Sequence, residues 1–250
     1  DLEARARALD SDVSALSLMA AHNETGVLMD LEAAAGLCAR HGALLHTDAV
    51  QAAGKVPIPW TGRFPDYLSL AGHKLYGPKG VGALVVRDGS PVAPLLRGGG
   101  QEGGRRASTE AVPLAASFGL ACELCGRDRS WREKAREMRD SLEAALRRDF
   151  GAVVHSAGAP RLPNTSFFSL ADAPAGAEVV RGLDELGFAV SAGSACHSAG
   201  ASSPRILAAM GVDPGVGGRA VRVSLGRATK EEDLAAFLRA LPQVLNPAGA

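Results

Sequence analysis

Short apolar runs alternate with a helical pattern in the first third of the chain, and this alternation limits the folds that the chain can adopt. Buried strands are predicted over residues 13–20, 43–48, 67–70 and 81–86, and a helix over residues 31–41. Strands and helices at this spacing form βαβ units, whose strands pair in parallel and whose helices cover the sheet. The sequence therefore predicts an α/β fold with a mostly parallel sheet.

The second half of the chain alternates less regularly. A long helical region over residues 112–149 is followed by shorter elements. Strands are predicted over residues 153–155, 165–170, 189–190 and 219–224, and helices over residues 178–186, 204–210 and 230–241. We therefore expect a large domain over residues 1–128 and a smaller α+β domain over residues 129–250.

Charge and cysteine content narrow the classes of function. The 250 residues carry 27 Lys and Arg against 27 Asp and Glu, so the net charge is zero and no basic surplus indicates a nucleic-acid partner. No apolar run approaches the length of a membrane span, which is about 18 residues. Four cysteines in a chain of this length do not suggest a disulfide framework, and we expect a reducing, cytoplasmic location.

Three polar residues follow predicted strands. Asn23, Asp48 and Lys74 each come where an apolar run ends. Ligands of open α/β sheets bind outside the carboxyl ends of the strands. The sequence therefore predicts that an amide, a carboxylate and an amine converge on one crevice.

Lys74 stands between a strand end and a tight turn, because residues 77–82 hold three glycines and a proline. Partial desolvation in such a place favours the neutral, nucleophilic form of an amine, which a Schiff-base lysine requires. The alternative is an ordinary loop lysine.

Asp48 ends a buried strand, where a carboxylate needs a cationic or donor partner. The protonated ring nitrogen of a bound pyridine is one such partner, and pyridoxal phosphate enzymes combine this acid with a Schiff-base lysine. Alternatively, Asp48 caps the turn that follows it. Gln51, three residues on, fits a capping box or a donor to a cofactor oxygen.

Cys196 and Arg222 are the candidates in the second half. Cys196 lies among Ser, Gly and Ala in a long loop, which favours a reactive thiol over a packing residue, with an idle exposed thiol as the alternative. Arg222 lies within an apolar strand and needs an anion, either a substrate carboxylate or a structural ion-pair partner. The remaining cysteines, Cys38, Cys122 and Cys125, are interpreted as helix packing residues.

Taken together, these residues resemble the cysteine desulfurase family, within the class V aminotransferase-like, fold-type I pyridoxal phosphate enzymes. The order and spacing of five motifs carry the resemblance over nearly all of the chain. They are AHNETG at residues 21–26, HTDAVQ at 46–51, GHKLYGP at 72–78, GGGQE at 98–102 and SACHS at 194–198.

The resemblance implies a role for each candidate residue. Lys74 would hold pyridoxal 5'-phosphate as a Schiff base, and Cys196 would be the nucleophile. The other cofactor contacts would be the ring nitrogen for Asp48, the ring oxygen for Gln51 and Asn23, and the phosphate for His73. Thr109 would reach the phosphate of a neighbouring subunit in a homodimer, and Arg222, with Asn23 nearby, would hold the substrate carboxylate.

The resemblance also implies an activity. L-Cysteine would be converted to L-alanine, with a persulfide formed on Cys196 and its sulfur passed to an acceptor protein. A selenocysteine lyase is the nearest alternative. A class V aminotransferase would not need Cys196, and an inactive, incomplete chain serving only as a dimer partner is a further alternative.

The chain departs from the family pattern in several places. It starts without the Gly-Thr phosphate loop and the ring-stacking histidine of the family, so it resembles an incomplete fold-type I large domain. Ala71 stands where many relatives have serine, Ser108 where they have glycine, and His22 where they have asparagine. We therefore expect the 250-residue chain alone to give little absorbance from a cofactor Schiff base.

Overall fold

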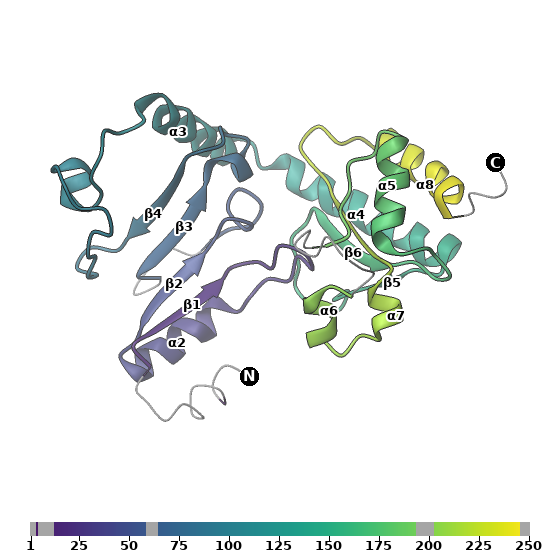
Figure 1. Ribbon diagram of the computed structural model, residues 1–250, viewed down its shortest axis with the longest axis horizontal. Coiled ribbons are helices and arrows are strands. Elements are labelled where there is room, and N and C mark those ends of the chain that lie inside the picture. The colour runs from purple at the N-terminus through teal and green to yellow at the C-terminus, as the bar shows by residue number, and fades with distance from the viewer. Residues whose placement is uncertain (1–3, 5–12, 59–64, 194–202, 246–250) are drawn as a thin grey trace. The chain divides into compact units, whose positions relative to one another are not determined.

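The computed structural model describes residues 4, 13–58, 65–193 and 203–245 and is drawn in Figure 1. The chain divides into two compact units. The first unit comprises Asp1–Ala21 and Met29–Arg129, and the second comprises His22–Leu28 and Ser130–Ala250. The short segment His22–Leu28 therefore packs with residues that lie far from it in the sequence.

The first unit is a four-stranded sheet with helices, in the order β1-β2-β3-β4 (Figure 1). The first three strands are parallel and β4 is antiparallel to β3, which confirms the predicted mostly parallel sheet. Its elements are β1 (Ala15–Met19), α2 (Leu31–His41), β2 (Leu44–Asp48), β3 (Tyr67–Ala71), the 3₁₀ helix η1 (Gly72–Leu75), β4 (Gly82–Val86), the 3₁₀ helix η2 (Gln101–Gly104) and α3 (Val112–Arg127).

Local signals at both ends fix helix α2, which confirms the predicted range. The side chain of Asp30 accepts a hydrogen bond from the Ala33 amide at 2.9 Å, and Gly42 ends the helix in the left-handed conformation. Leu31, Ala34 and Leu37 form the buried stripe of the helix. Helix α2 packs on β1 and β2, so one face of the sheet is covered.

Alternation along the strands gives the sheet two different faces. Leu45, Thr47 and Leu68 point to one face and are buried. Asp48 points to the other face, in register with Met19 and Ser69 on the neighbouring strands. Both Asp48 and Met19 are exposed, so this second face is open in the described part of the first unit.

The second unit is a three-stranded antiparallel sheet, in the order β5-β6-β7, with helices on both faces. Strand β6 is buried throughout: Phe168 belongs to one hydrophobic cluster, with Leu183 and Leu241, and Phe167 packs with Leu207 in another. Its elements are α4 (Ser130–Phe150), β5 (Val153–Val154), β6 (Thr165–Ser169), α5 (Gly176–Glu185), α6 (Arg205–Ala209), α7 (Pro214–Gly217), β7 (Ala220–Ser224) and α8 (Glu231–Leu245).

Three expectations from the sequence are wrong in detail. The single helical region over residues 112–149 is two helices, because Asp128 is extended between α3 and α4. The pair Ala189-Val190 forms no strand, and the next residue, Ser191, forms an isolated bridge with Arg222. Cys122 is exposed on α3 and is not a packing residue, whereas Cys125 is buried as expected.

A buried ion pair ties helix α4 to the segment before β6. Glu143 accepts two hydrogen bonds from the guanidinium of Arg161, at 2.8 and 3.1 Å, and both side chains are about 95% buried, with exposures of 3% and 5%. Burial acts to raise the pKa of Glu143, but the hydrogen bonds and the charge of Arg161 outweigh it, so the pKa lies below its ordinary value.

We predict that Glu143→Gln lowers the free energy of unfolding by about 3–5 kcal/mol, because Arg161 is left as a buried, unpaired charge. Glu137→Gln, an exposed change on the same helix, should cost less than about 0.5 kcal/mol. Chemical denaturation measures both. The carboxylate contributes its stability above the ordinary pKa of 4.5, and this contribution is lost as pH falls through the lowered folded pKa. A wild-type pH profile that matches that of Glu143→Gln would contradict the prediction.

Candidate active site

The parallel pairing of β2 and β3 brings Asp48 and Lys74 to the same edge of the first unit. Asp48 is the last residue of β2 and is in register with Ser69 of β3. Lys74 lies in η1, which begins directly after β3. Both residues therefore lie at the carboxyl edge of the parallel strands, where open α/β sheets bind ligands.

Glycines shape the turn that presents Lys74. A Cβ atom at Gly72 would lie 2.9 Å from Val81 Cγ1 and 3.1 Å from the Pro78 carbonyl oxygen. A Cβ atom at Gly77 would lie 3.0 Å from the Gly72 carbonyl oxygen. Tyr76 between them ends η1 in the left-handed conformation, with φ 64°. The backbone is thus packed too closely for side chains at either glycine.

The turn after β2 uses only one of the two carboxylate oxygens of Asp48. Its Oδ1 accepts a hydrogen bond from the Val50 amide at 2.9 Å, so the capping role considered for Asp48 is present. Within the described residues, Oδ2 has no partner, and Lys74 makes no hydrogen bond or ion pair. One carboxylate oxygen and one amine therefore remain available to a ligand at this edge.

A hydrogen-bonded row on the open face was not foreseen from the sequence. His46 Nδ1 lies 2.7 Å from Ser17 Oγ, and His46 Nε2 lies 2.8 Å from Ser69 Oγ. The row joins three strands and lies two residues before Asp48 on β2. The signal for it was available, since residues 46 and 48 of one strand must share a face. The row therefore lies on the same face of the sheet as Asp48.

The remaining first-unit candidates lie around the same turns. Gln51 follows Asp48, and its Oε1 accepts a hydrogen bond from Lys55 Nζ at 3.0 Å. His73 is exposed beside Lys74 in η1. Thr109 is exposed before α3 and follows Ser108, whose φ is 89°.

Asn23 and Arg222 meet in the second unit. Arg222 lies in the middle of β7, and its Nη1 donates a hydrogen bond to the Asn23 carbonyl oxygen at 2.8 Å. Burial lowers the pKa of Arg222, while the charge of Glu24 acts to raise it. No carboxylate lies within ion-pair distance of Arg222 in the described ranges, so the structural ion pair considered from the sequence is absent there. Cys196 lies outside the described residues.

His22 shapes the turn that carries Asn23. Its Nδ1 accepts from the amides of Glu24, at 3.3 Å, and Thr25, at 3.2 Å. An asparagine side chain makes the same contacts in a turn. His22 therefore takes the place of the asparagine that relatives have at this position. An acceptor Nδ1 must be unprotonated, and burial lowers the pKa of His22 against the opposing charge of Glu24.

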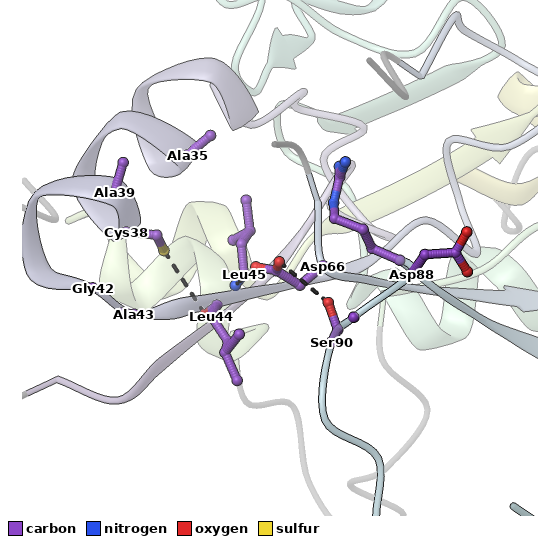
Figure 2. A pocket seen from close by; sticks show the side chains of 12 residues that line it. Ala35, Cys38, Ala39, Gly42, Ala43, Leu44, Leu45, Asp66, Asp88 and Ser90 are labelled. Atoms are coloured by element: carbon purple, nitrogen blue, oxygen red, sulfur yellow. Dashed lines mark hydrogen bonds between the residues drawn. The ribbon is translucent and has the colours of Figure 1, made fainter. Parts of the chain in front are cut away.

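A cavity of about 540 Å³ lies at the opposite edge of the first unit (Figure 2). At its wall, Asp66 accepts from the Leu45 amide at 2.8 Å and from Ser90 Oγ at 3.4 Å. Burial, and then the charge of Asp66, raise the pKa of Cys38 at its wall. A raised pKa favours the protonated thiol, which is its less reactive form, and the cavity lies away from the edge that carries Asp48 and Lys74.

Other kinds of site find no support in the residues that the structure describes. Among the described residues, no group of three or more His, Cys, Asp or Glu side chains could hold a metal ion. Their helices are also too short or too polar to cross a membrane. The strand edge with Asp48 and Lys74 is the candidate active site, because both residues lie at the carboxyl edge of the parallel strands.

Comparison with known proteins identifies the family. Residues 1–237 match the family model of the class-V aminotransferases. The chain belongs to this family. A cysteine desulfurase from Cereibacter sphaeroides is 43% identical over 98% of the chain and 63% of its own length. The cysteine desulfurase NifS from Azotobacter vinelandii is 40% identical over 98% of the chain and 61% of its own length. The chain thus spans about three fifths of these class-V relatives.

Solved structures of the class-V family show the same fold. A NifS-like protein from Rickettsia africae superposes with a TM-score of 0.86 at 28% identity, over 97% of this chain and 65% of that protein. SspA, solved in complex with cysteine, superposes with a TM-score of 0.73 at 29% identity, over 90% of this chain and 62% of that protein.

The histidine in the Asn23 turn generates a pH prediction. A His with a lowered folded pKa contributes stability above its ordinary value of 6.5, and the contribution is lost as pH falls through the folded pKa. We predict that His22→Asn removes the loss of stability that protonation of His22 causes as pH falls, because asparagine keeps the acceptor and does not titrate. The measurement is the melting temperature of both proteins between about pH 8 and about pH 5.

His155 provides the control for this comparison. It is buried in the second unit, and burial lowers its pKa as well. His155 should therefore leave a residual pH dependence in both proteins. Equal slopes for wild type and His22→Asn would show that the turn does not depend on an unprotonated His22.

Proposed function

We propose that the protein is a pyridoxal phosphate-dependent cysteine desulfurase. It would convert L-cysteine to L-alanine and pass the sulfur to an acceptor. One observation carries the proposal: at the carboxyl edge of a class-V sheet, one carboxylate oxygen of Asp48 and the amine of Lys74 both lack partners among the described residues. The names of the relatives, which are cysteine desulfurases, support the choice of substrate.

The residues at this edge fit pyridoxal phosphate. Asp48 offers its free Oδ2 to a protonated ring nitrogen while Oδ1 is fixed by the Val50 amide. Lys74 is presented by a turn that glycines keep narrow. Gln51 and His73 flank these two residues and suit the ring oxygen and the phosphate. When bound, the cofactor supplies an electron sink for the amino acid.

For the amino acid itself, we propose Arg222 and Asn23 as the residues that bind its carboxylate. Arg222 uses Nη1 on the Asn23 carbonyl, which leaves its other N–H groups for a carboxylate. Asn23 itself is exposed. These two residues would orient the substrate carboxylate and hold the amino acid in one register.

The sulfur step needs a thiolate, and Cys196 is the residue we propose for it. Its sulfur would attack the substrate sulfur, so that an S–S bond forms and the Cβ–S bond of the substrate breaks. The electron pair of the broken bond stays with the substrate carbon, which takes up a proton and leaves within L-alanine. The enzyme keeps the sulfur as a persulfide on Cys196, and no external oxidant or reductant is consumed.

The proposal extends to assembly and location. Thr109 is exposed and would contact the cofactor phosphate of a second subunit, so we propose a homodimer. A sulfur-acceptor protein would take the sulfur from Cys196. Because Cys196 must be a free thiol at the start of each turnover, and the cytoplasm keeps thiols free, we propose a cytoplasmic location.

We predict that the protein expressed from its complete gene releases L-alanine and sulfide from L-cysteine in the presence of pyridoxal phosphate and dithiothreitol. Lys74→Ala and Cys196→Ala should each lower sulfide release by roughly a thousandfold or more, since each removes a group that takes part in the reaction. Cys122→Ala is the matched control, because this exposed thiol on α3 has no proposed role.

The same assay separates the alternatives. With L-selenocysteine, a selenocysteine lyase would retain part of its selenide release in Cys196→Ala, and its preference would lie with selenium. A class-V aminotransferase would form no sulfide and would be indifferent to Cys196→Ala. If the wild-type protein released neither L-alanine nor sulfide from L-cysteine, this result would contradict the proposed function.

A further inference from the structure

Two oppositely charged side chains in the second unit carry buried atoms without partners. Glu24 is 5% exposed, and its Oε2 makes no hydrogen bond in the described part of the chain. Nε of Arg222 is likewise buried and without a partner there. A buried carboxylate is costly unless a charge or a donor compensates it, so Glu24 calls for a functional explanation.

The surroundings of Glu24 place it beside the backbone that supports Arg222. A Cβ atom at Gly193 would lie 3.3 Å from Glu24 Oε2, so this oxygen faces Gly193. Two residues earlier, Ser191 pairs with Arg222 through both backbone bonds, at 2.6 and 3.2 Å. Ser191 Oγ in turn donates to the Gly193 carbonyl at 2.9 Å. Glu24, Gly193 and the Ser191–Arg222 bridge therefore form one contiguous cluster.

The turn of Glu24 also fixes the other end of Arg222. Asn23, the residue before Glu24, provides the carbonyl that accepts from Arg222 Nη1. The His22 ring holds the Glu24 amide, so the position of the carboxylate is set by the turn itself. The charge of Glu24 acts on Arg222 although the two groups form no ion pair within 4.0 Å in the described ranges. This arrangement holds the guanidinium and leaves it free for another carboxylate.

We propose that Glu24 is a positioning residue for Arg222. Its buried negative charge compensates the buried part of the guanidinium, and the Asn23 carbonyl fixes Nη1. The remaining N–H groups then face the carboxylate of an amino-acid substrate. The substrate part of this inference rests on the proposed function, whereas the hold of Glu24 on Arg222 does not.

The first test observes Arg222 directly and needs no activity. In nuclear magnetic resonance, the exchange of the Arg222 Nε–H with water reports how firmly the guanidinium is held. Glu24→Gln keeps the shape and removes the charge, and the exchange should become at least about tenfold faster, because the buried guanidinium loses the negative charge that compensates it. Glu178→Gln, an exposed change in the first turn of α5, should leave the exchange rate as in wild type.

Glu24→Asp and a melting curve complete this test. Aspartate restores the charge and should recover part of the slow exchange, which a purely steric role of the glutamate would not explain. The melting curve confirms that Glu24→Gln is folded at the temperature of the measurement. An exchange rate in folded Glu24→Gln equal to that of wild type overturns the inference.

The second test links Arg222 to the substrate. This test applies once the wild-type protein is shown to turn over L-cysteine. Compared with wild type, Glu24→Gln should then raise KM for L-cysteine about tenfold and leave kcat within about twofold. KM for L-cysteine ethyl ester, which lacks the carboxylate, should not change. In an Arg222→Ala background, Glu24→Gln should add no further effect on KM.

The outcomes separate the two proposals. Faster Nε–H exchange in Glu24→Gln with no turnover of L-cysteine by wild type supports the hold on Arg222 and contradicts the proposed function. Turnover by wild type with an unchanged or lower KM in Glu24→Gln contradicts the inference alone.

Discussion

The parallel pairing of β2 with β3 is the constraint on which the candidate active site depends. Parallel strands end at the same edge, so the residue that closes β2 and the turn that follows β3 must be neighbours. The register between Asp48 and Ser69 sets how far along that edge the carboxylate lies. A slip of one residue would turn Asp48 and His46 to the face that α2 covers, where Leu45 and Leu68 are now buried.

The sequence predicts those parts of the fold that local signals determine. Helix α2 has a cap at Asp30 and a glycine stop at Gly42, and its range was predicted without error. The break at Asp128 carries no glycine or proline, so a helical pattern simply continues across it. Helical spacing does not exclude Cys122 from the core, because it lies four residues after the buried Phe118 and three before the buried Cys125, so its exposure follows only from the packing around α3.

The candidate site was predictable to the extent that it follows strand ends. Asp48 and Lys74 were found by this rule, and Arg222 was found as a charge inside an apolar strand. Glu24 was missed, because a glutamate in a polar turn is expected to be solvated. Its burial depends on segment His22–Leu28 packing with the second unit, and this packing lies between residues distant in sequence. Gly26, with φ 72° and a Cβ position 3.2 Å from Thr165 Cβ, takes part in this close packing.

Two buried glutamates in the second unit differ in whether their carboxylate oxygens have hydrogen-bond partners, and this difference distinguishes a structural residue from a functional one. Glu143 and Glu24 are buried to a similar degree, with exposures of 3% and 5%. Every oxygen of Glu143 is engaged by arginine, so the fold alone accounts for its presence. Glu24 keeps an unpartnered oxygen beside an arginine that also keeps an unpartnered nitrogen. The charge of Glu24 acts on the buried Arg222, so we infer that the glutamate serves the binding role proposed for Arg222 and not the packing of the fold.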